Sequence, residues 1–221
     1  MRSMFFAVLL SAAMPCAAFA QTANDLKNDE KTPGDVLVYG MGYSGNRFSP
    51  LTQINKENVS KLVPVWAYSL ADLQGGESFP LIKDGVIYAT THNATVAVDA
   101  LSGKQIWRVI HDYPPENLRV VCCGIVNRGA AIYEGMVICA LMDNRLVALD
   151  AKTGKEIWMV NSPEPALPQN GYAMTGAPLI VNGVVIMGVA GAEFSHRGFL
   201  EGYDARTGAH LWRLYTVPAE G

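Results

Sequence analysis

The chain has 221 residues, half of them hydrophobic, with 17 basic and 20 acidic side chains and a formal net charge of −3. Its basic residues are scattered along the sequence, so the chain lacks the concentrated positive surface that binding to nucleic acid requires. Low charge and 21 glycines favour a compact fold of many short strands joined by tight turns.

Residues 1–20 have the layout of a secretory signal peptide. A basic residue precedes an apolar run from Met4 to Ala13, and Ala18-Phe19-Ala20 ends in the small-x-small pattern that signal peptidase recognises. The alternative, a membrane anchor, is disfavoured because the apolar run is shorter than a bilayer-spanning helix. We therefore expect cleavage after Ala20 and a periplasmic mature chain without a transmembrane anchor.

The mature chain is expected to begin with a polar lead-in over residues 21–36, which can hold a short helix. Beyond it, an Asp-x-x-x-Gly-x-x-x-Trp pattern occurs three times with the same internal spacing, ending at Trp107, Trp158 and Trp212. The tryptophans are roughly 50 residues apart, a period typical of repeat architectures. The sequence therefore predicts repeated structural units over residues 37–221.

Each repeat contains the signals of four short strands. The alternating run before the Asp predicts a half-buried strand, the Asp and Gly predict a tight hairpin, and the next strand ends on a Trp that can pack between sheets. Two further strands precede each copy. They are expected at residues 79–82 and 85–90, at 129–132 and 135–141, and at 177–181 and 184–189. Four antiparallel strands form one β-propeller blade; a β-sandwich with coincidentally similar turns is the alternative.

One further segment, Leu62–Trp66, has the pattern of the last strand of a blade but has no preceding strands of its own. Strands that could pair with it would have to follow Gly221. A closed propeller also needs at least about four blades. The sequence therefore predicts an all-β open arc, three blades and one orphan strand of a larger propeller.

The cysteines differ in their surroundings. Cys139 lies in an apolar strand pattern and is expected to be a buried free thiol. Cys122 and Cys123 are adjacent. Neighbouring Cα atoms are about 3.8 Å apart, which is below the usual range for a disulfide. The residues alone leave open either a strained bridge between neighbours or two free thiols.

The third repeat carries an insertion over residues 190–198, between its second and third strands. Long glycine-containing loops on a rigid β scaffold commonly carry binding sites. Glu193 in this loop is flanked by apolar side chains, and a partly buried carboxylate needs a partner. A metal cation and an arginine such as Arg197 are the two alternatives.

Several segments of the chain resemble the pyrroloquinoline-quinone (PQQ) dependent alcohol dehydrogenases, quinoproteins with an eight-bladed propeller. The matching segments are residues 46–55, 58–59 and 62–66, Val121–Cys123 with its adjacent cysteines, Asn127–Gly129, Met174–Pro178, and Gly191–Glu193. The resemblance runs from about Pro33 to Pro218 and covers the N-terminal part of the family domain. It implies the N-terminal portion of a PQQ-dependent alcohol or methanol dehydrogenase.

The resemblance also implies roles for particular residues. Cys122 and Cys123 would form a vicinal disulfide stacked on one face of the planar quinone. Glu77 would hydrogen-bond the polar edge of the cofactor. Arg128 and Thr175 would hold carboxylates of PQQ, the arginine through its charge-matched fork of N–H groups.

A metal ion is implied by the same resemblance. The backbone at Gly191 and Ala192 would approach the cofactor, and Glu193 would ligate Ca²⁺ or a lanthanide ion, hard cations that take oxygen ligands. The metal-bound PQQ would oxidise a primary alcohol to an aldehyde and pass electrons to a cytochrome c or quinone acceptor. Ala190 departs from the family pattern, which often has Ser there.

Parts of the family site have no counterpart in this sequence. The catalytic Asp, an Asn metal ligand and the Trp under the other face of the cofactor belong to later blades. We therefore expect the 221-residue chain alone to be inactive. The alternative function is a non-catalytic propeller scaffold with PQQ-like repeats. The residues implied to bind the cofactor favour the enzyme, because a scaffold needs only the tryptophan repeats.

Overall fold

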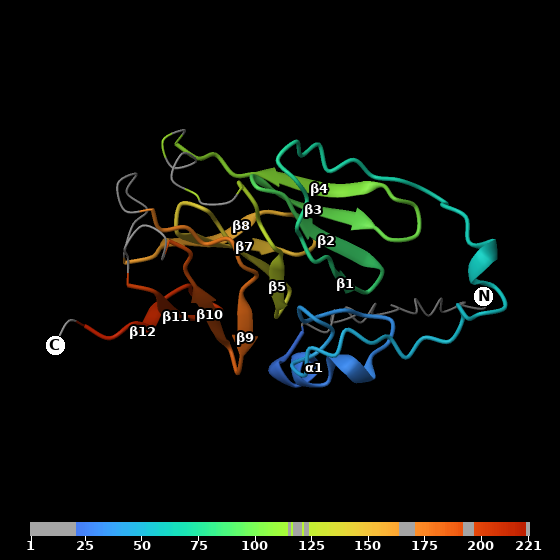
Figure 1. The fold of residues 1–221 in the computed structure, drawn as a ribbon, viewed down its shortest axis with the longest axis horizontal. Coiled ribbons are helices and arrows are strands. Elements are labelled where there is room, and N and C mark those ends of the chain that lie inside the picture. The colour runs from blue at the N-terminus through green and yellow to red at the C-terminus, as the bar shows by residue number, and fades with distance from the viewer. Residues whose placement is uncertain are drawn as a thin grey trace, which may run out of the picture.

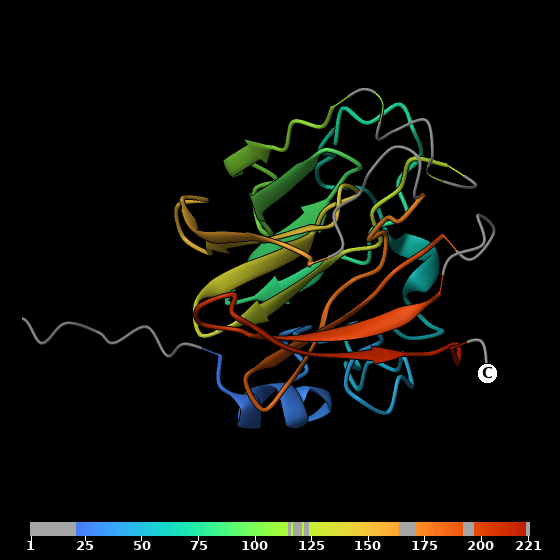
Figure 2. The same ribbon diagram turned by 90° about the vertical axis from the view of Figure 1, so that its left-hand side faces the viewer.

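Three four-stranded antiparallel sheets lie side by side in the protein, with a short helical segment at one end (Figures 1 and 2). The computed structural model describes residues 21–114, 116, 121, 124–163, 171–191 and 197–219. Within these residues, no helix is long and apolar enough to cross a membrane.

Each sheet is a meander in which strands that are consecutive in sequence pair with one another. Blade 1 consists of β1 (Leu81–Lys83), β2 (Val86–Thr90), β3 (Ala94–Asp99) and β4 (Gln105–Ile110). Blade 2 consists of β5 (Ala130–Tyr133), β6 (Met136–Ala140), β7 (Arg145–Asp150) and β8 (Glu156–Asn161). Blade 3 consists of β9 (Leu179–Val181), β10 (Val184–Gly188), β11 (Phe199–Asp204) and β12 (His210–Tyr215). The four-stranded blades expected from the sequence are confirmed.

The first strands of neighbouring blades approach one another. Contacts join β1 to β5 and β5 to β9, and a parallel bridge pairs Phe79 with Gly129 just before the first two of these strands. The strands β1, β5 and β9 are therefore the inner strands of the arc. This is the radial arrangement of a propeller, in which each blade presents its first strand to a common centre.

Three tryptophans, Trp66 and the repeat residues Trp107 and Trp158, each contact the blade that follows them in the chain. In every case the indole N–H donates to the carbonyl of the alanine that follows the turn aspartate of the next blade. The three pairs are Trp66–Ala100, Trp107–Ala151 and Trp158–Ala205, with N···O distances of 3.2, 2.9 and 3.2 Å. The predicted packing of tryptophan between sheets is confirmed for Trp107 and Trp158 and comes with a repeated hydrogen bond, whereas Trp212 of blade 3 is 38% exposed.

The turn chemistry predicted for each repeat is also present. In blade 2, the carboxylate of Asp150 accepts hydrogen bonds from the backbone N–H groups of Lys152 and Thr153 and from the Thr153 hydroxyl. The hydroxyl bond, followed by these backbone bonds, holds the pKa of Asp150 below its usual value. Gly154 adopts a φ of +72°, and a Cβ there would lie 2.8 Å from the Trp107 ring. Glycine is thus required by both backbone conformation and packing.

The segment Leu62–Trp66 follows a short 3-10 helix (η2, Val59–Lys61) and is assigned no strand. Trp66 nevertheless docks on blade 1 as the other tryptophans dock on their neighbours. Large hydrophobic side chains are exposed along this part of the chain: Phe48, Leu51, Ile54, Val59, Leu62, Val63 and Val65. The orphan segment thus makes the blade-to-blade contact without belonging to a described sheet.

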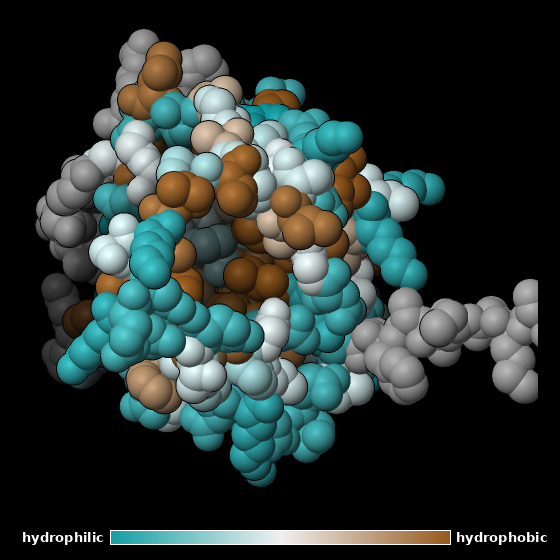
Figure 3. Space-filling model, turned by 90° about the vertical axis from the view of Figure 1, so that its right-hand side faces the viewer, coloured by the Kyte–Doolittle hydropathy of each residue, from teal (hydrophilic) through white to brown (hydrophobic). Residues whose placement is uncertain are grey.

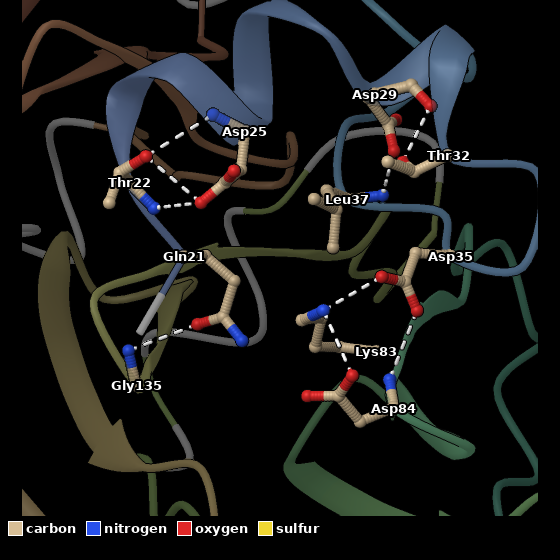
Figure 4. A network of polar contacts seen from close by, with 10 residues as sticks. All are labelled: Gln21, Thr22, Asp25, Asp29, Thr32, Asp35, Leu37, Lys83, Asp84 and Gly135. Atoms are coloured by element: carbon tan, nitrogen blue, oxygen red, sulfur yellow. Dashed lines mark hydrogen bonds and ion pairs between the residues drawn. The ribbon is translucent and has the colours of Figure 1, made fainter. Parts of the chain in front are cut away.

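The lead-in contains the expected short helix, α1 (Ala23–Lys27), followed by a 3-10 turn (η1, Asp29–Lys31). Thr22 and Asp25 form a capping box at the start of α1 (Figure 4). The buried carboxylate of Asp29 accepts hydrogen bonds from the backbone N–H groups of Leu37 and Val38 at 2.9 and 3.0 Å. These contacts give the lead-in a fixed course although it contains little regular structure.

All three blades hold the lead-in at the end where their inner strands finish. Asp35 accepts hydrogen bonds from Lys83 Nζ and the Asp84 backbone N–H at the β1–β2 turn (Figure 4). Blade 3 contacts the lead-in where β9 lies against α1, and Tyr43, just beyond the lead-in, donates its hydroxyl to the carbonyl of Ile180. Blade 2 contacts Gln21 through its β5–β6 turn. The lead-in therefore ties the three blades together at this end.

The core of the described chain lies between the blades. Cys139 on β6 is fully buried, as predicted, and its Sγ lies 3.2 Å from the Thr95 hydroxyl of blade 1. Burial raises the pKa of the Cys139 thiol to about 12. This cysteine is therefore an inert packing residue rather than a nucleophile.

Candidate functional site

Three residues for which the sequence suggests a shared role lie together at the end opposite the lead-in. Glu77, Arg128 and Thr175 precede the inner strands β1, β5 and β9 by a few residues each. Arg128 Nη2 lies 3.0 Å from Glu77 Oε2, and Arg128 Nη1 donates to Thr175 Oγ1 at 2.8 Å. The three side chains thus form one continuous polar chain across three blades.

Backbone hydrogen bonds fix the positions of these residues. The Phe79 N–H donates to the carbonyl of Arg128 at 3.1 Å, and the Arg128 N–H donates to the carbonyl of Thr175 at 3.0 Å. Each blade is therefore joined to the next through the segment that carries a site residue. The main-chain hydrogen bonds therefore help to fix the relative positions of the Glu77, Arg128 and Thr175 side chains.

A buried polar network supports Glu77 and Arg128 from beneath. The Thr90 N–H donates to Ser78 Oγ at 3.0 Å, and the Thr90 hydroxyl donates to Asn127 Oδ1 at 2.6 Å. The Asn127 amide nitrogen donates to the carbonyl of Ala140 at 2.8 Å. Thr90 and Asn127 are both nearly inaccessible. They connect the residues adjacent to Glu77 and Arg128, so they hold the two segments at a fixed spacing.

Sequence reasoning missed this supporting network. Asn127 immediately precedes Arg128 in a matched motif, and Thr90 ends a predicted strand, but no local pattern pairs them. A hydrogen bond between side chains 37 positions apart depends on how two blades pack. The available signal was a polar residue at the end of an otherwise apolar strand.

The site pair itself is exposed to solvent. The side chains of Glu77 and Arg128 are 48% and 46% accessible. An exposed ion pair of this kind stabilises a fold by only about 0–1 kcal/mol. The guanidinium of Arg128 has five N–H donors in a planar fork, which is more than its contacts with Glu77 and Thr175 use. The arrangement is suited to binding a carboxylate from solution.

An apolar cavity of about 400 Å³ lies beside Arg128. The inner strands β5 and β9 and the lead-in enclose it, with Arg128 contributing polar character to its wall. Its other lining residues include Leu37, Tyr39, Ile132 and Pro178. In a space-filling view, the surface of the protein is hollowed and hydrophobic residues form the floor of the hollow (Figure 3).

The remaining site predictions fall in the insertion and the cysteine motif. The backbone of Ala190 pairs with Ala173, and Gly191 follows with a φ of +129°. A Cβ at Gly191 would lie 2.6 Å from the carbonyl oxygen of Gly171. Close packing of two backbone segments therefore requires this glycine, whether or not a ligand approaches it.

Four predicted site residues, Cys122, Cys123, Ala192 and Glu193, lie outside the described residues. The vicinal disulfide and the metal ligand therefore stay predictions. In the described part of the chain, no cluster of three or more His, Cys, Asp or Glu residues could hold a metal ion. Arg197, the alternative partner for Glu193, donates to the Val217 carbonyl and stacks over the Tyr215 ring.

The sequence of this chain is similar to PQQ-dependent dehydrogenases over most of its length. The family model for the PQQ glucose/ethanol/alcohol dehydrogenase β-propeller domain matches residues 37–221. Quinohemoprotein alcohol dehydrogenase ADH IIB of Pseudomonas putida is 43% identical over 216 residues, which cover 96% of this chain and 31% of that relative. The dehydrogenase subunit of alcohol dehydrogenase (quinone) of Gluconobacter oxydans is 46% identical over 220 residues, covering 96% and 29%.

Solved structures show the same relationship. Quinohemoprotein alcohol dehydrogenase ADHIIG of Pseudomonas putida superposes with a TM-score of 0.84 at 40% identity, covering 89% of this chain and 29% of that chain. A europium-containing methanol dehydrogenase superposes with a TM-score of 0.80 at 34% identity, covering 87% and 34%. This chain therefore spans about a third of the length of these relatives, and it belongs to the PQQ glucose/ethanol/alcohol dehydrogenase β-propeller family.

Proposed function

We propose that this chain is the N-terminal, cofactor-binding part of a periplasmic PQQ-dependent alcohol dehydrogenase that oxidises a primary alcohol to an aldehyde. The observation that carries the proposal is the polar chain from Glu77 through Arg128 to Thr175, assembled from three blades. The family match and the alcohol dehydrogenases among the relatives support it.

The chemistry of the site fits PQQ. Arg128 and Thr175 together offer a charged fork and a hydroxyl, which suit a carboxylate of the cofactor. Glu77 can accept a hydrogen bond from an N–H or O–H group, and its exposure leaves it accessible. When bound, PQQ supplies a quinone that accepts the two electrons removed from the alcohol. The residues of this chain bind and orient the cofactor; the network of Thr90 and Asn127 keeps them in place.

The proposal extends to a metal ion and an electron acceptor. Glu193 would contribute one carboxylate oxygen to Ca²⁺ or a lanthanide ion, which is the ligand type such cations prefer. One solved relative is named as europium-containing. Other relatives are named as quinohemoproteins or as quinone-dependent dehydrogenase subunits. These names support a haem protein such as cytochrome c, or a quinone, as the acceptor.

The isolated chain is proposed to be inactive. A single carboxylate is far fewer than the six to eight oxygen ligands that Ca²⁺ normally takes. The described site is also open to solvent on Glu77 and Arg128, whereas oxidation of a bound alcohol needs a pocket that excludes competing water. Purified chain supplied with PQQ, Ca²⁺ and ethanol should therefore give no reduction of an artificial dye acceptor above the protein-free rate.

A chimaera tests the functional assignment. Residues 37–221 replace the matching part of Pseudomonas putida ADH IIB, and dye reduction with a primary alcohol is measured with and without PQQ. We expect PQQ-dependent activity, at least a hundredfold lower with Arg128→Gln and unchanged with Arg206→Gln. Arg206 is a matched control because it pairs with Glu134 at the opposite end of the blades. A cooperatively folded chimaera with no PQQ-dependent activity would contradict the assignment.

A further inference from the structure

The segment over residues 71–77, which we call the Glu77 loop, leads into the candidate site and ends on Glu77. It contains no helix or strand, and all of its residues except Asp72 are exposed. Gly75 and Gly76 come just before Glu77, and a Cβ at either glycine would meet nothing within 4 Å. Packing within the loop therefore does little to hold Glu77 in place.

Asp72 is the exception, because only 3% of its side chain is accessible. Its carboxylate accepts hydrogen bonds from the backbone N–H groups of His92 and Gln74 at 3.2 and 2.9 Å, and its Oδ1 lies 2.8 Å from Nδ1 of His92. Burial raises the pKa of Asp72, but these hydrogen bonds outweigh burial and hold its pKa below the usual value. An ionised carboxylate only accepts hydrogen bonds, so Nδ1 of His92 carries the proton and donates it.

His92 lies in the turn between β2 and β3, which is itself held by backbone hydrogen bonds. The Thr91 N–H donates to the carbonyl of Ala94 at 2.7 Å and closes the turn. The His111 N–H, just after β4, donates to the carbonyl of Asn93 at 2.7 Å. The turn is therefore a fixed base to which the exposed loop is attached.

A second attachment follows Glu77 directly. The Thr90 N–H donates to Ser78 Oγ at 3.0 Å, and Thr90 is the last residue of β2. The Glu77 loop is thus joined to the same end of blade 1 on both sides, through Asp72 with His92 and through Ser78 with Thr90.

We propose that Asp72 and His92 are positioning residues for the cofactor site, which fix the course of the Glu77 loop so that the Glu77 carboxylate faces Arg128. The inference rests on the proposed binding of PQQ and extends that site by two residues that act only through Glu77. A loop that is already ordered loses less conformational freedom when a ligand binds, so the ligand binds more tightly. Loss of the Asp72–His92 pair should therefore weaken PQQ binding.

The ion pair between Glu77 and Arg128 is insufficient to order the loop. Both side chains are about half exposed, at 48% and 46%, and exposed ion pairs contribute little to holding a structure. The side chains of Asp72 and His92 are less exposed, at 3% and 18%, so water weakens their hydrogen bond less. The order of the Glu77 loop thus depends on the buried pair.

The first test needs no cofactor. Heteronuclear NMR relaxation of the isotope-labelled chain reports the order of each backbone N–H group on the picosecond-to-nanosecond timescale. We expect residues 73–77 to be ordered in the wild-type protein and more mobile in His92→Leu and in Asp72→Ala. His92→Asn should stay as ordered as the wild type, because asparagine carries a donor nitrogen on Cγ, where histidine carries Nδ1. Unchanged order in His92→Leu would overturn the proposal.

A titration of the same variants with PQQ, followed by NMR, measures the effect on the site. We expect His92→Leu to weaken PQQ binding about fivefold or more and His92→Asn to change it less than about twofold. In a Glu77→Ala background, His92→Leu should have less than about a twofold further effect, because the pair acts through Glu77. An equal effect of His92→Leu with and without the Glu77 side chain would contradict that route and overturn the proposal.

Asp35→Ala is the matched control for Asp72→Ala. The Asp35 carboxylate also accepts hydrogen bonds from a side chain and from the backbone, those of Lys83 and Asp84, but at the opposite end of the blades. Its loss should change PQQ affinity by less than about twofold, and a loss of affinity equal to that of Asp72→Ala would overturn the proposal. A wild-type chain that binds no PQQ would refute the proposed function and this inference with it. Wild-type binding that His92→Leu leaves unchanged would refute this inference alone.

Discussion

Arg128 is the central residue of the candidate site, because its side chain contacts both Glu77 and Thr175. Its guanidinium contacts residues from both neighbouring blades, and its own N–H and C=O groups pair with the same two blades. Its position therefore depends on the correct packing of all three sheets. The buried residue before it, Asn127, provides a further constraint through its contacts with Thr90, Gly129 and Ala140.

Replacing Asn127 should destabilise the protein more than replacing an exposed asparagine. Asn127→Ala removes the acceptor of the Gly129 N–H, the closer of two acceptors of the buried Thr90 hydroxyl, and the side-chain donor to the Ala140 carbonyl. We expect a loss of about 2–4 kcal/mol in the free energy of unfolding, measured by chemical denaturation. Asn46→Ala, which removes an exposed contact with Ser44, should change it by less than about 0.5 kcal/mol. Equal effects for the two variants would contradict the role assigned to Asn127.

His111 should make stability depend on pH. Its ring nitrogen Nε2 lies 2.8 Å from the Thr95 hydroxyl, and burial together with the nearby charge of Arg145 lowers its pKa to about 4. An unfolded histidine has a pKa of about 6.5. Between these values the unfolded chain binds more protons, so stability is present above about pH 6.5 and is lost as the pH falls towards 4.

The contribution of His111 can be isolated by comparison with His111→Gln. The wild-type protein should lose up to about 3 kcal/mol of unfolding free energy between about pH 6.5 and about pH 4 in excess of the variant. Chemical denaturation of both proteins at each pH gives this difference directly and cancels the other titrating groups. A parallel pH dependence in the two proteins would show that the fold does not lower the pKa of His111 and would contradict this prediction.

At the scale of elements, the hairpin between the third and fourth strands recurs with the same parts. Each has an aspartate that accepts backbone N–H groups and a glycine with φ between +70° and +73°. The glycine of each turn also faces a tryptophan that precedes its blade in the chain, which is Trp66, Trp107 or Trp158. One short motif therefore closes a hairpin and forms half of an interface between blades.

Substitution of two turn glycines should separate the cost of strained backbone conformation from the cost of a clash with tryptophan. Gly154 and Gly85 both have φ above +70°, but a Cβ at Gly154 would contact the Trp107 ring, and one at Gly85 would meet nothing within 4 Å. We expect Gly85→Ala to cost about 1 kcal/mol of unfolding free energy and Gly154→Ala about 2–4 kcal/mol. Thermal or chemical unfolding measures both. A cost for Gly154→Ala no larger than for Gly85→Ala would remove the packing explanation.

Local patterns predicted the blades well because strands, turns and the tryptophan repeat are encoded within short segments. The expected first and second strands of each blade lie within two residues of those observed, whereas each fourth strand runs three residues past the tryptophan that was expected to end it. The burial of Cys139 was predicted from its apolar neighbours. The proximity of Glu77, Arg128 and Thr175 could be expected only from the family resemblance. Their hydrogen bonds, the Thr90–Asn127 contact and the anchoring of Gln21 depend on the packing of distant segments, which no local pattern specifies.

At the scale of the whole molecule, the two ends of the inner strands have different roles. At one end, the lead-in contacts blade 1 through Asp35, blade 2 through Gln21 and blade 3 through α1. At the other end, the segments before β1, β5 and β9 present the chain of site residues. The lead-in therefore stabilises the arc from the end where it does not obstruct the proposed cofactor site.

The most direct test of this account is an NMR titration of the isotope-labelled chain with PQQ. Binding to an exposed site should be weak, and we expect fast-exchange shifts concentrated on the backbone amides of Glu77, Arg128 and Thr175 and on the Arg128 side chain. Arg128→Gln should abolish these shifts, whereas Arg206→Gln should preserve them. Shifts that centre on another surface, or that persist in Arg128→Gln, would contradict the assignment of these three residues as the cofactor site.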